Sequence, residues 1–224
     1  MTRNHYRAVL VQAYNFAIAN GYAAENPALK TAKAKVLGEP PGILTVEQAA
    51  SLLESADSEI LAYCAIGLFA GLRRAEIERL DWSEIDFEEG LIEVTAQNSK
   101  TAQHRFVTIQ PNLREWLFPH RQLKGSVIPV ADFKKRFDQA RIAAGIKQWP
   151  PNALRHSFAS YHLAHFKNAA STALELGHHD SRITFEHYRE LVRPRLAKAY
   201  WNIRPAAKAN VVEFQPRRQT VRRS

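Results

Sequence analysis

The spacing of apolar positions predicts a chain made mostly of helices. In the first 80 residues, helices are expected at about 5–20, 45–56, 58–71 and 73–80. The helix at 58–71 is apolar around its whole circumference, which predicts burial on every side. Thr45 and Gln48 have the spacing of a capping box, in which each side chain binds the backbone N–H of the other residue.

One stretch changes from helical to extended spacing. Apolar residues at 91–94 and 106–109 flank a polar segment, Gln97 to His104, which predicts a β-hairpin with a long tip. From Pro111 onward the pattern is helical again, with breaks at glycines and prolines, and the last helix is expected to begin near Ser181. The predicted fold class is therefore mostly α with a small antiparallel β-sheet.

Composition narrows the choice of partner. The 224 residues carry a formal charge of +9 and a pI near 9.8, which favours a polyanion such as nucleic acid. Cys64 is the single cysteine and lies in an apolar run, where a small buried hydrophobe in a reducing cytosol is expected. The longest apolar run, 60–70, is too short to span a bilayer and no signal peptide is evident, so no membrane partner is expected.

Two arginines, Arg73 and Arg155, lie at positions where a positive charge is unexpected unless it has a specific partner. Arg73 follows the apolar helix directly, and it can pair with Glu76 on the helix surface or serve a site near the core. Arg155 falls in the first turn of a helix that Asn152 is expected to cap, where a positive charge opposes the helix dipole. An anion bound at that helix end would make the position favourable, and an exposed arginine without a role is the alternative. The buried stripe of this helix is expected to be Leu154, Phe158 and Tyr161, with Arg155 on another face.

A histidine, a tyrosine and a lysine complete the candidate chemistry. His178 follows a predicted helix end, where a histidine is often only a favourable cation at the dipole. Tyr188 stands ten residues later, and a tyrosine on a helix is usually a packing residue. Lys100 lies in the predicted hairpin tip, where a solvated lysine is the ordinary interpretation. Each signal is weak alone, so the argument depends on their order along the chain.

A metal site is not expected. His162, His165, His179 and His187 are close in sequence, but they lack the spacing of metal ligands and have no evident Cys or carboxylate partners.

Taken in order, the candidate residues resemble those of the tyrosine recombinases, also called the phage integrase family. The matching phrases are Gly-Leu-Arg-x-x-Glu at 71–76, Leu-Arg-His at 154–156, Leu-Gly-His at 176–178, and Tyr188. The resemblance runs from about residue 42 to 205, and a fainter one covers the first 38 residues.

The resemblance implies a role for each matching residue. Arg73, Arg155 and His178 would bind the scissile phosphate and stabilise the transition state, while Glu76 would orient the basic site. Tyr188 would attack the phosphate and form a 3′-phosphotyrosyl link. A 5′-hydroxyl of another strand would then reverse the step, so neither a cofactor nor a metal is implied.

Three positions complete or depart from the family pattern. Lys100 stands where the family has a hairpin lysine, which would protonate the leaving 5′-oxygen. Asn152 replaces a histidine that the family commonly carries, and asparagine cannot exchange a proton near neutrality. His156 fills the next position of the motif and is expected to pack beside Arg155. Asn152 and His156 are therefore supporting residues, and the activity of this copy stays open.

The resemblance also divides the chain. The expected parts are a partial helical core-binding arm at 1–38, a linker at 39–42, the catalytic domain at 43–205, and a basic tail at 206–224 that is expected to be disordered. The arm matches only the last part of the family's core-binding domain, so the chain looks like a shortened integrase. A separate chain could supply the remaining helices.

The resulting prediction is a site-specific DNA recombinase or integrase of a mobile element. It would act on double-stranded DNA in the cytoplasm, associated with the nucleoid, and self-associate on DNA as a synaptic tetramer by family resemblance. A truncated, non-catalytic DNA-binding relic is the second hypothesis, motivated by Asn152 and the short arm. A basic structural or RNA-binding protein is the third, although the chain has no recognisable RNA-binding signature.

Overall fold

The structure is a computed structural model that describes residues 2–34, 41–95, 104–128, 131–178, 188 and 192–206. The chain divides into two compact units, residues 1–39 and 40–224, and each is described by itself. The finer domain boundaries given above stay predictions.

The first unit is built around one helix. α1 (Arg3–Ala19) ends at Asn20, as its sequence predicts, and the 3₁₀ turn η1 (Pro27–Lys30) packs against it. Asn26 joins the two, because its side-chain amide donates hydrogen bonds to the Val11 carbonyl oxygen and to the side chain of Asn15. All residues of α1 are described and none is buried, so the helix has little hydrophobic support within its own unit.

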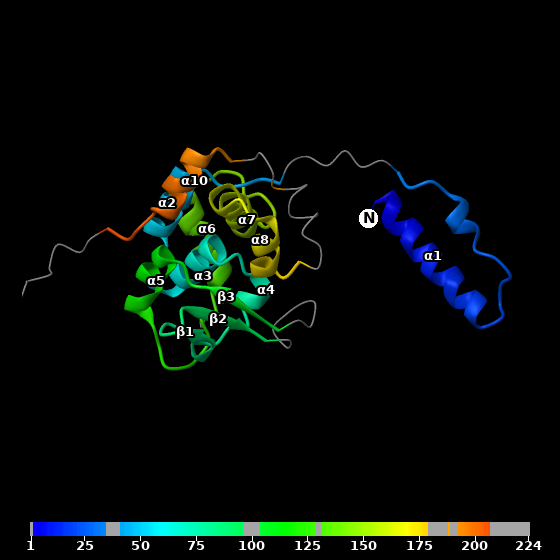
Figure 1. Cartoon of the computed structure of the whole chain (residues 1–224), viewed down its shortest axis with the longest axis horizontal. Coiled ribbons are helices and arrows are strands. Elements are labelled where there is room, and N and C mark those ends of the chain that lie inside the picture. Colours follow the sequence, from blue (N-terminus) through cyan, green and yellow to red (C-terminus); the bar gives the residue numbers. More distant parts are fainter. Residues whose placement is uncertain are drawn as a thin grey trace, which may run out of the picture. The chain divides into compact units, whose positions relative to one another are not determined.

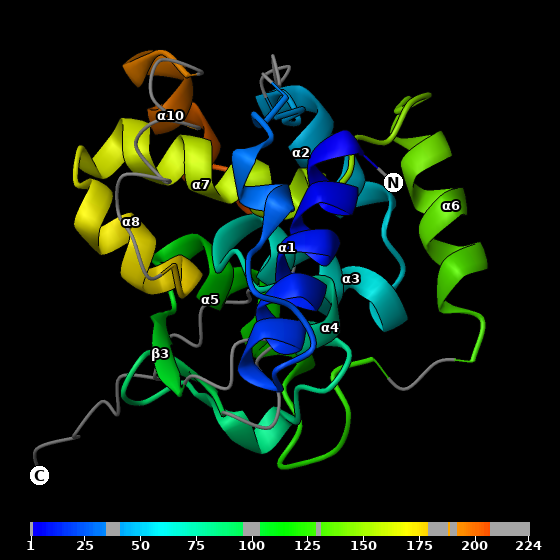
Figure 2. The same ribbon diagram turned by 90° about the vertical axis from the view of Figure 1, so that its right-hand side faces the viewer.

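The second unit is a body of helices with a sheet along one edge (Figure 1). The helices among its described residues are α2 (Val46–Ser55), α3 (Ser58–Phe69), α4 (Arg74–Ile77), α5 (Pro111–Leu117), α6 (Phe133–Ala143), α7 (Ala153–Phe166), α8 (Ala169–Leu176) and α10 (Pro194–Trp201), with 3₁₀ turns η2 (Trp82–Glu84) and η3 (Phe118–His120). α10 lies at the end of the body opposite the sheet, and α6 lies along one flank (Figure 2).

The centre of the unit is α3. Every residue from Ile60 to Phe69 is buried, as the all-round apolar sequence predicts, and α3 packs against α2, α5 and α7. The capping box before it is confirmed: Gln48 N–H donates to the Thr45 hydroxyl oxygen, and Thr45 N–H donates to the Gln48 side chain.

The sheet is antiparallel, with strands β1 (Ile85–Asp86), β2 (Leu91–Val94) and β3 (Arg105–Thr108) in that order among the described residues. β2 pairs with β3 so that Leu91 faces Thr108, which confirms the predicted hairpin. β1 was not predicted, because two residues give no alternation to recognise. The predicted tip, including Lys100, lies outside the described residues.

The structure corrects the two helices that carry the candidate arginines. α4 is shorter than predicted, and Arg73 is its N-cap in extended conformation rather than a residue of its first turn. α7 is buried on every side over most of its length, so the predicted single buried stripe is wrong and Arg155 is buried with its neighbours. The reason is that α3, α8 and α10 all pack on α7. The spacing of apolar residues along one helix does not show how many other helices will surround it.

Asn152 begins α7, but it does not cap the helix as predicted. Its backbone is left-handed, with φ of 53°, and in the described structure its side chain makes no cap hydrogen bond. Asparagine tolerates this conformation better than most residues, which gives a backbone reason for its presence.

The predicted last helix near residue 181 falls outside the described residues except for Tyr188, and α10 begins separately at Pro194. In the part of the chain that is described, no helix is both long enough and apolar enough to cross a membrane.

Candidate active site

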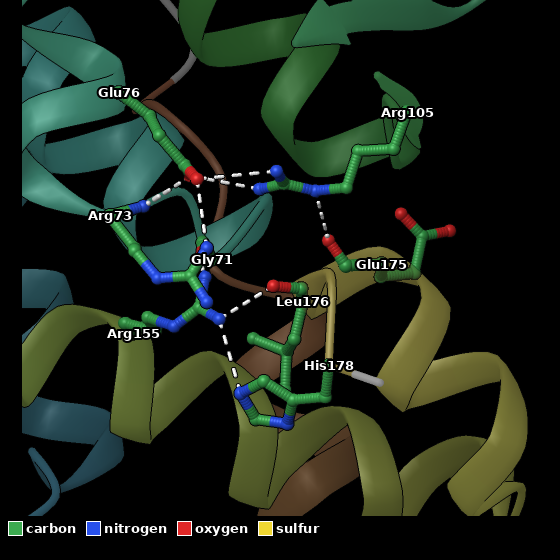
Figure 3. Close-up of polar contacts among 8 residues, drawn as sticks. All are labelled: Gly71, Arg73, Glu76, Arg105, Arg155, Glu175, Leu176 and His178. Carbon is green, nitrogen blue, oxygen red and sulfur yellow. Dashed lines mark hydrogen bonds and ion pairs between the residues drawn. The ribbon is translucent and has the colours of Figure 1, made fainter. Parts of the chain in front are cut away.

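Arg155 is fixed by backbone carbonyl groups. It lies in the first turn of α7 and is only 8% exposed. Its Nη1 donates to the Gly71 carbonyl oxygen at 2.7 Å, and its Nη2 donates to the Leu176 carbonyl oxygen at 2.6 Å (Figure 3). Nη2 also lies 3.2 Å from Nε2 of His178. One guanidinium therefore joins the segment after α3 to the end of α8 and excludes the interpretation of Arg155 as an exposed arginine.

The two glycines of these segments have the backbone that this arrangement needs. Gly71 has φ of +64°, and a Cβ there would lie 2.3 Å from the ring of Phe158. Gly177 has φ of +63°, and a Cβ there would lie 3.2 Å from the Arg105 side chain. A side chain at Gly71 would meet both backbone strain and a clash, so glycine is required where the carbonyl turns toward Arg155.

Glu76 gathers the other basic side chains. It is 1% exposed, and its carboxylate accepts hydrogen bonds from Nη1 and the backbone N–H of Arg73 at 2.9 and 2.8 Å. It also accepts from Nη1 and Nη2 of Arg105 at 3.2 and 2.8 Å (Figure 3). Burial alone would raise the pKa of Glu76, but Arg105 and then Arg73 outweigh burial and hold it below its ordinary value. Glu76 is therefore a charged support for both arginines.

Arg105 is the residue that sequence reasoning missed. Its Nε donates to the Glu175 carbonyl oxygen at 3.1 Å, and the N–H and hydroxyl of Thr108 donate to the Glu175 carboxylate. β3 is thereby attached to the last turn of α8, three residues before His178. The available signal was a charged residue opening the second predicted strand of the hairpin, which local spacing alone does not distinguish from a residue at a solvated edge.

The electrostatic balance of this cluster favours an anion. Arg73, Arg105 and Arg155 lie around the single carboxylate of Glu76 in the described cluster, which leaves an excess of positive charge. Burial first, and then the positive charge of Arg73, lower the pKa of Arg155 to about 9. A bound phosphate would relieve this repulsion and could accept charge-assisted hydrogen bonds from more than one guanidinium.

His178 is neutral at physiological pH. Burial, followed by the positive charges of Arg155 and Arg73, lowers the pKa of His178 to about 4. A neutral imidazole beside Arg155 can donate a hydrogen bond to an anion from one ring nitrogen.

Tyr188 lies against α7, the helix that carries Arg155. It is 6% exposed, and its hydroxyl oxygen is 2.7 Å from Nδ1 of His156, so His156 does more than pack beside Arg155. Burial raises the pKa of Tyr188, and the charge of Arg155 partly opposes that rise. Tyr161 and Tyr200 are elsewhere in the core, because their hydroxyls donate to backbone carbonyl groups of Leu44 and Leu68.

A cavity of about 560 Å³ opens beside the arginines. Arg73, Asn152 and Arg155 line one part of it, and Phe133, Phe137 and Trp149 contribute aromatic side chains. Asn152 is exposed at this position. In the described part of the chain, no three His, Cys, Asp or Glu residues are grouped so that they could hold a metal ion.

Comparison with known proteins places the arrangement in a family. The model of the phage integrase family matches residues 43–193. The chain belongs to the phage integrase family. The match covers all the site residues described above, and it confirms the resemblance inferred from the sequence.

Family members with known names are similar over most of the chain. Tyrosine recombinase XerC of Xanthomonas axonopodis pv. citri (strain 306) is 28% identical over 216 residues, which cover 87% of this chain and 69% of the relative. XerC of Vibrio cholerae serotype O1 (strain M66-2) is 27% identical over 213 residues, covering 87% of this chain and 68% of the relative.

Solved structures show the same fold at lower identity. XerA recombinase aligns with a TM-score of 0.59 and 20% identity, covering 92% of this chain and 78% of that chain. A lambda integrase dimer bound to a COC′ core site aligns with a TM-score of 0.62 and 20% identity, covering 84% of this chain and 72% of that chain. The fold class predicted from the sequence is therefore confirmed.

Proposed function

We propose that this protein is a site-specific DNA recombinase that cleaves and rejoins strands through a 3′-phosphotyrosyl intermediate. The main support is a pair of contacts made by consecutive residues of α7. Arg155 contacts His178 in a buried cluster, and His156 contacts the hydroxyl of Tyr188. The proposed phosphate-binding residue and the residue that contacts the phenol are therefore neighbours on α7. Membership of the phage integrase family supports the same reaction.

The proposed chemistry begins with a DNA phosphodiester bound by Arg73, Arg155 and His178. The guanidinium groups neutralise the charge that develops on the phosphate oxygens, and Glu76 keeps Arg73 in place. The phenol oxygen of Tyr188 attacks phosphorus and the bond to the 5′-oxygen breaks. Lys100, which lies outside the described residues, is proposed to protonate that leaving oxygen.

The second half of the reaction reverses the first. The 5′-hydroxyl of another strand attacks the phosphotyrosyl link and releases Tyr188. The link conserves the phosphodiester bond energy, so the exchange requires no nucleotide cofactor. The attack needs the phenol to lose its proton, which burial disfavours in the free protein.

The proposed partner is double-stranded DNA, with self-association on it. The lambda integrase chains of similar fold include a dimer on a core site and a tetramer on a Holliday junction. The charge of +9 supports binding through phosphate contacts, whose affinity should fall steeply as salt rises. We place the reaction in the cytoplasm, at the nucleoid.

The deciding experiment is covalent trapping on a nicked DNA substrate from which the cleaved strand end diffuses away. The wild-type protein should form an adduct that survives denaturation, and Tyr188→Phe should form none while keeping its fold and DNA binding. Tyr161→Phe is the matched control, since its hydroxyl contacts only the Leu44 carbonyl among the described partners, and it should still form the adduct. A wild-type protein that binds DNA without any adduct would support the relic hypothesis instead.

A further inference from the structure

Two adjacent residues of α7, Arg155 and His156, have side chains that contact different groups. Arg155 turns toward the carbonyl groups of Gly71 and Leu176, while His156 turns toward Tyr188. The His156 and Tyr188 rings have centroids 5.7 Å apart and are tilted by 41°, and the 2.7 Å contact joins ring nitrogen to phenol oxygen. This is hydrogen-bond geometry on the atom that must lose a proton.

Within the described part of the site, the other candidates for receiving that proton are poorly suited. The carboxylate of Glu76 already accepts hydrogen bonds from Arg73 and Arg105. His178 lies against Arg155, and its pKa of about 4 makes it a weak proton acceptor. Asn152 carries a neutral amide, which cannot exchange a proton near neutrality.

We propose that Nδ1 of His156 accepts the phenolic proton of Tyr188 as the phenol attacks the phosphate. This inference rests on the proposed function and adds a catalytic residue to it. As the Tyr188 oxygen–phosphorus bond forms, the phenolic proton moves to Nδ1 and the bond from phosphorus to the 5′-oxygen breaks. A separate acid protonates the leaving oxygen, and in the reverse step His156 returns its proton to the departing phenolate.

The assignment requires one tautomer. Nδ1 can accept only if the neutral ring carries its proton on Nε2, with the Tyr188 hydroxyl as donor. The phenol can donate at neutral pH, because burial raises the pKa of Tyr188 above its ordinary value of 10. Among the described residues, the charge of Arg155, on α7 itself, acts on Tyr188, and His178, which follows α8, interacts electrostatically with His156.

The first experiment measures the tautomer without any DNA. Nitrogen chemical shifts of the histidine-labelled full chain at pH 8 should show His156 as the Nε2–H form, with its signals identified by their absence in His156→Gln. A proton on Nδ1 would overturn the proposal, whatever the outcome of the trapping experiment. This separates failure of the proposal from failure of the proposed function.

The second experiment is single-turnover cleavage of the nicked substrate. His156→Gln should cleave about 10²–10⁴-fold more slowly, the usual effect of losing a general base. His165→Gln is the matched control: His165 is exposed on the same helix and away from the described site, so its rate should stay within about 3-fold of wild type.

A further comparison distinguishes proton transfer from positioning. Fluorinated tyrosine at position 188 has a more acidic phenol and should depend less on a base, so the deficit of His156→Gln should shrink. A purely structural role predicts the same deficit with either phenol. An unchanged deficit, or wild-type cleavage by His156→Gln, would overturn the proposal.

Discussion

Arg105 and Glu76 form an ion pair that is nearly closed to solvent. The Nη2–Oε2 distance is 2.8 Å, and the two side chains are 9% and 1% exposed. The pair joins β3 to α4, and Arg73 shares the same carboxylate. Through Glu76, Arg105 of the sheet thus helps to hold Arg73, which is proposed to contact DNA.

Arg105→Met should lower the free energy of unfolding by about 3–5 kcal/mol, because it leaves the buried carboxylate of Glu76 with Arg73 as its remaining described ionic partner. Chemical denaturation measures the change. Glu76→Gln added to Arg105→Met should recover only part of the loss, since it removes the carboxylate that lost Arg105 but also takes that carboxylate away from Arg73. Losses that simply add in the double variant would contradict the coupling.

Arg155→Lys should impair both stability and cleavage. A lysine keeps the charge, but its single ammonium cannot reproduce the forked bonds to Gly71 and Leu176. Unpaired buried carbonyl groups should cost about 1–3 kcal/mol in thermal or chemical unfolding. Adduct formation should fall about 10²–10³-fold in a single-turnover assay. Arg74→Lys, at an exposed position paired with Glu78, is the control and should change neither quantity appreciably.

Asn152→His should raise cleavage modestly, by less than the about 10²–10⁴-fold of a full general base, because His156 already contacts the phenol. The gain should be most visible between about pH 6 and 8. The free energy of unfolding should fall by about 1 kcal/mol, because a histidine is strained in the left-handed backbone conformation of this position. No cap hydrogen bond is lost, since the Asn152 side chain makes none in the described structure. Asn152→Gly fits that backbone without an imidazole and should give no gain. Equal rates for both variants would show that position 152 does not limit the reaction.

Stability should fall as the pH drops from about 6.5 to about 4. Burial, and then the charge of His165, lowers the pKa of His162 from 6.5 to about 4, so the unfolded chain binds its proton first. His178 acts in the same direction. Denaturation at several pH values measures the slope, which His162→Gln should reduce while the exposed His120→Gln should not. An unchanged slope in His162→Gln would contradict burial of a neutral histidine.

Local sequence determined the elements whose signals are short in range. The apolar run of α3 predicted burial on every side, and Thr45 with Gln48 predicted a capping box, because both features depend on residues within a few positions. The order of the motifs identified the family before any geometry was known. The roles assigned to Arg73, Arg155, His178 and Tyr188 stay predictions until cleavage is measured.

Tertiary structure decided what those residues touch. Arg105 reaches Glu76 across 29 positions and Glu175 across 70, and His156 reaches Tyr188 across 32. No local pattern encodes such pairs, because they form only when separate helices and strands pack together. The same reason explains the error at α7, because its burial comes from neighbours distant in sequence. The sequence alone therefore identified the candidate chemical groups, and the packing of helices and strands determined which of them are in contact.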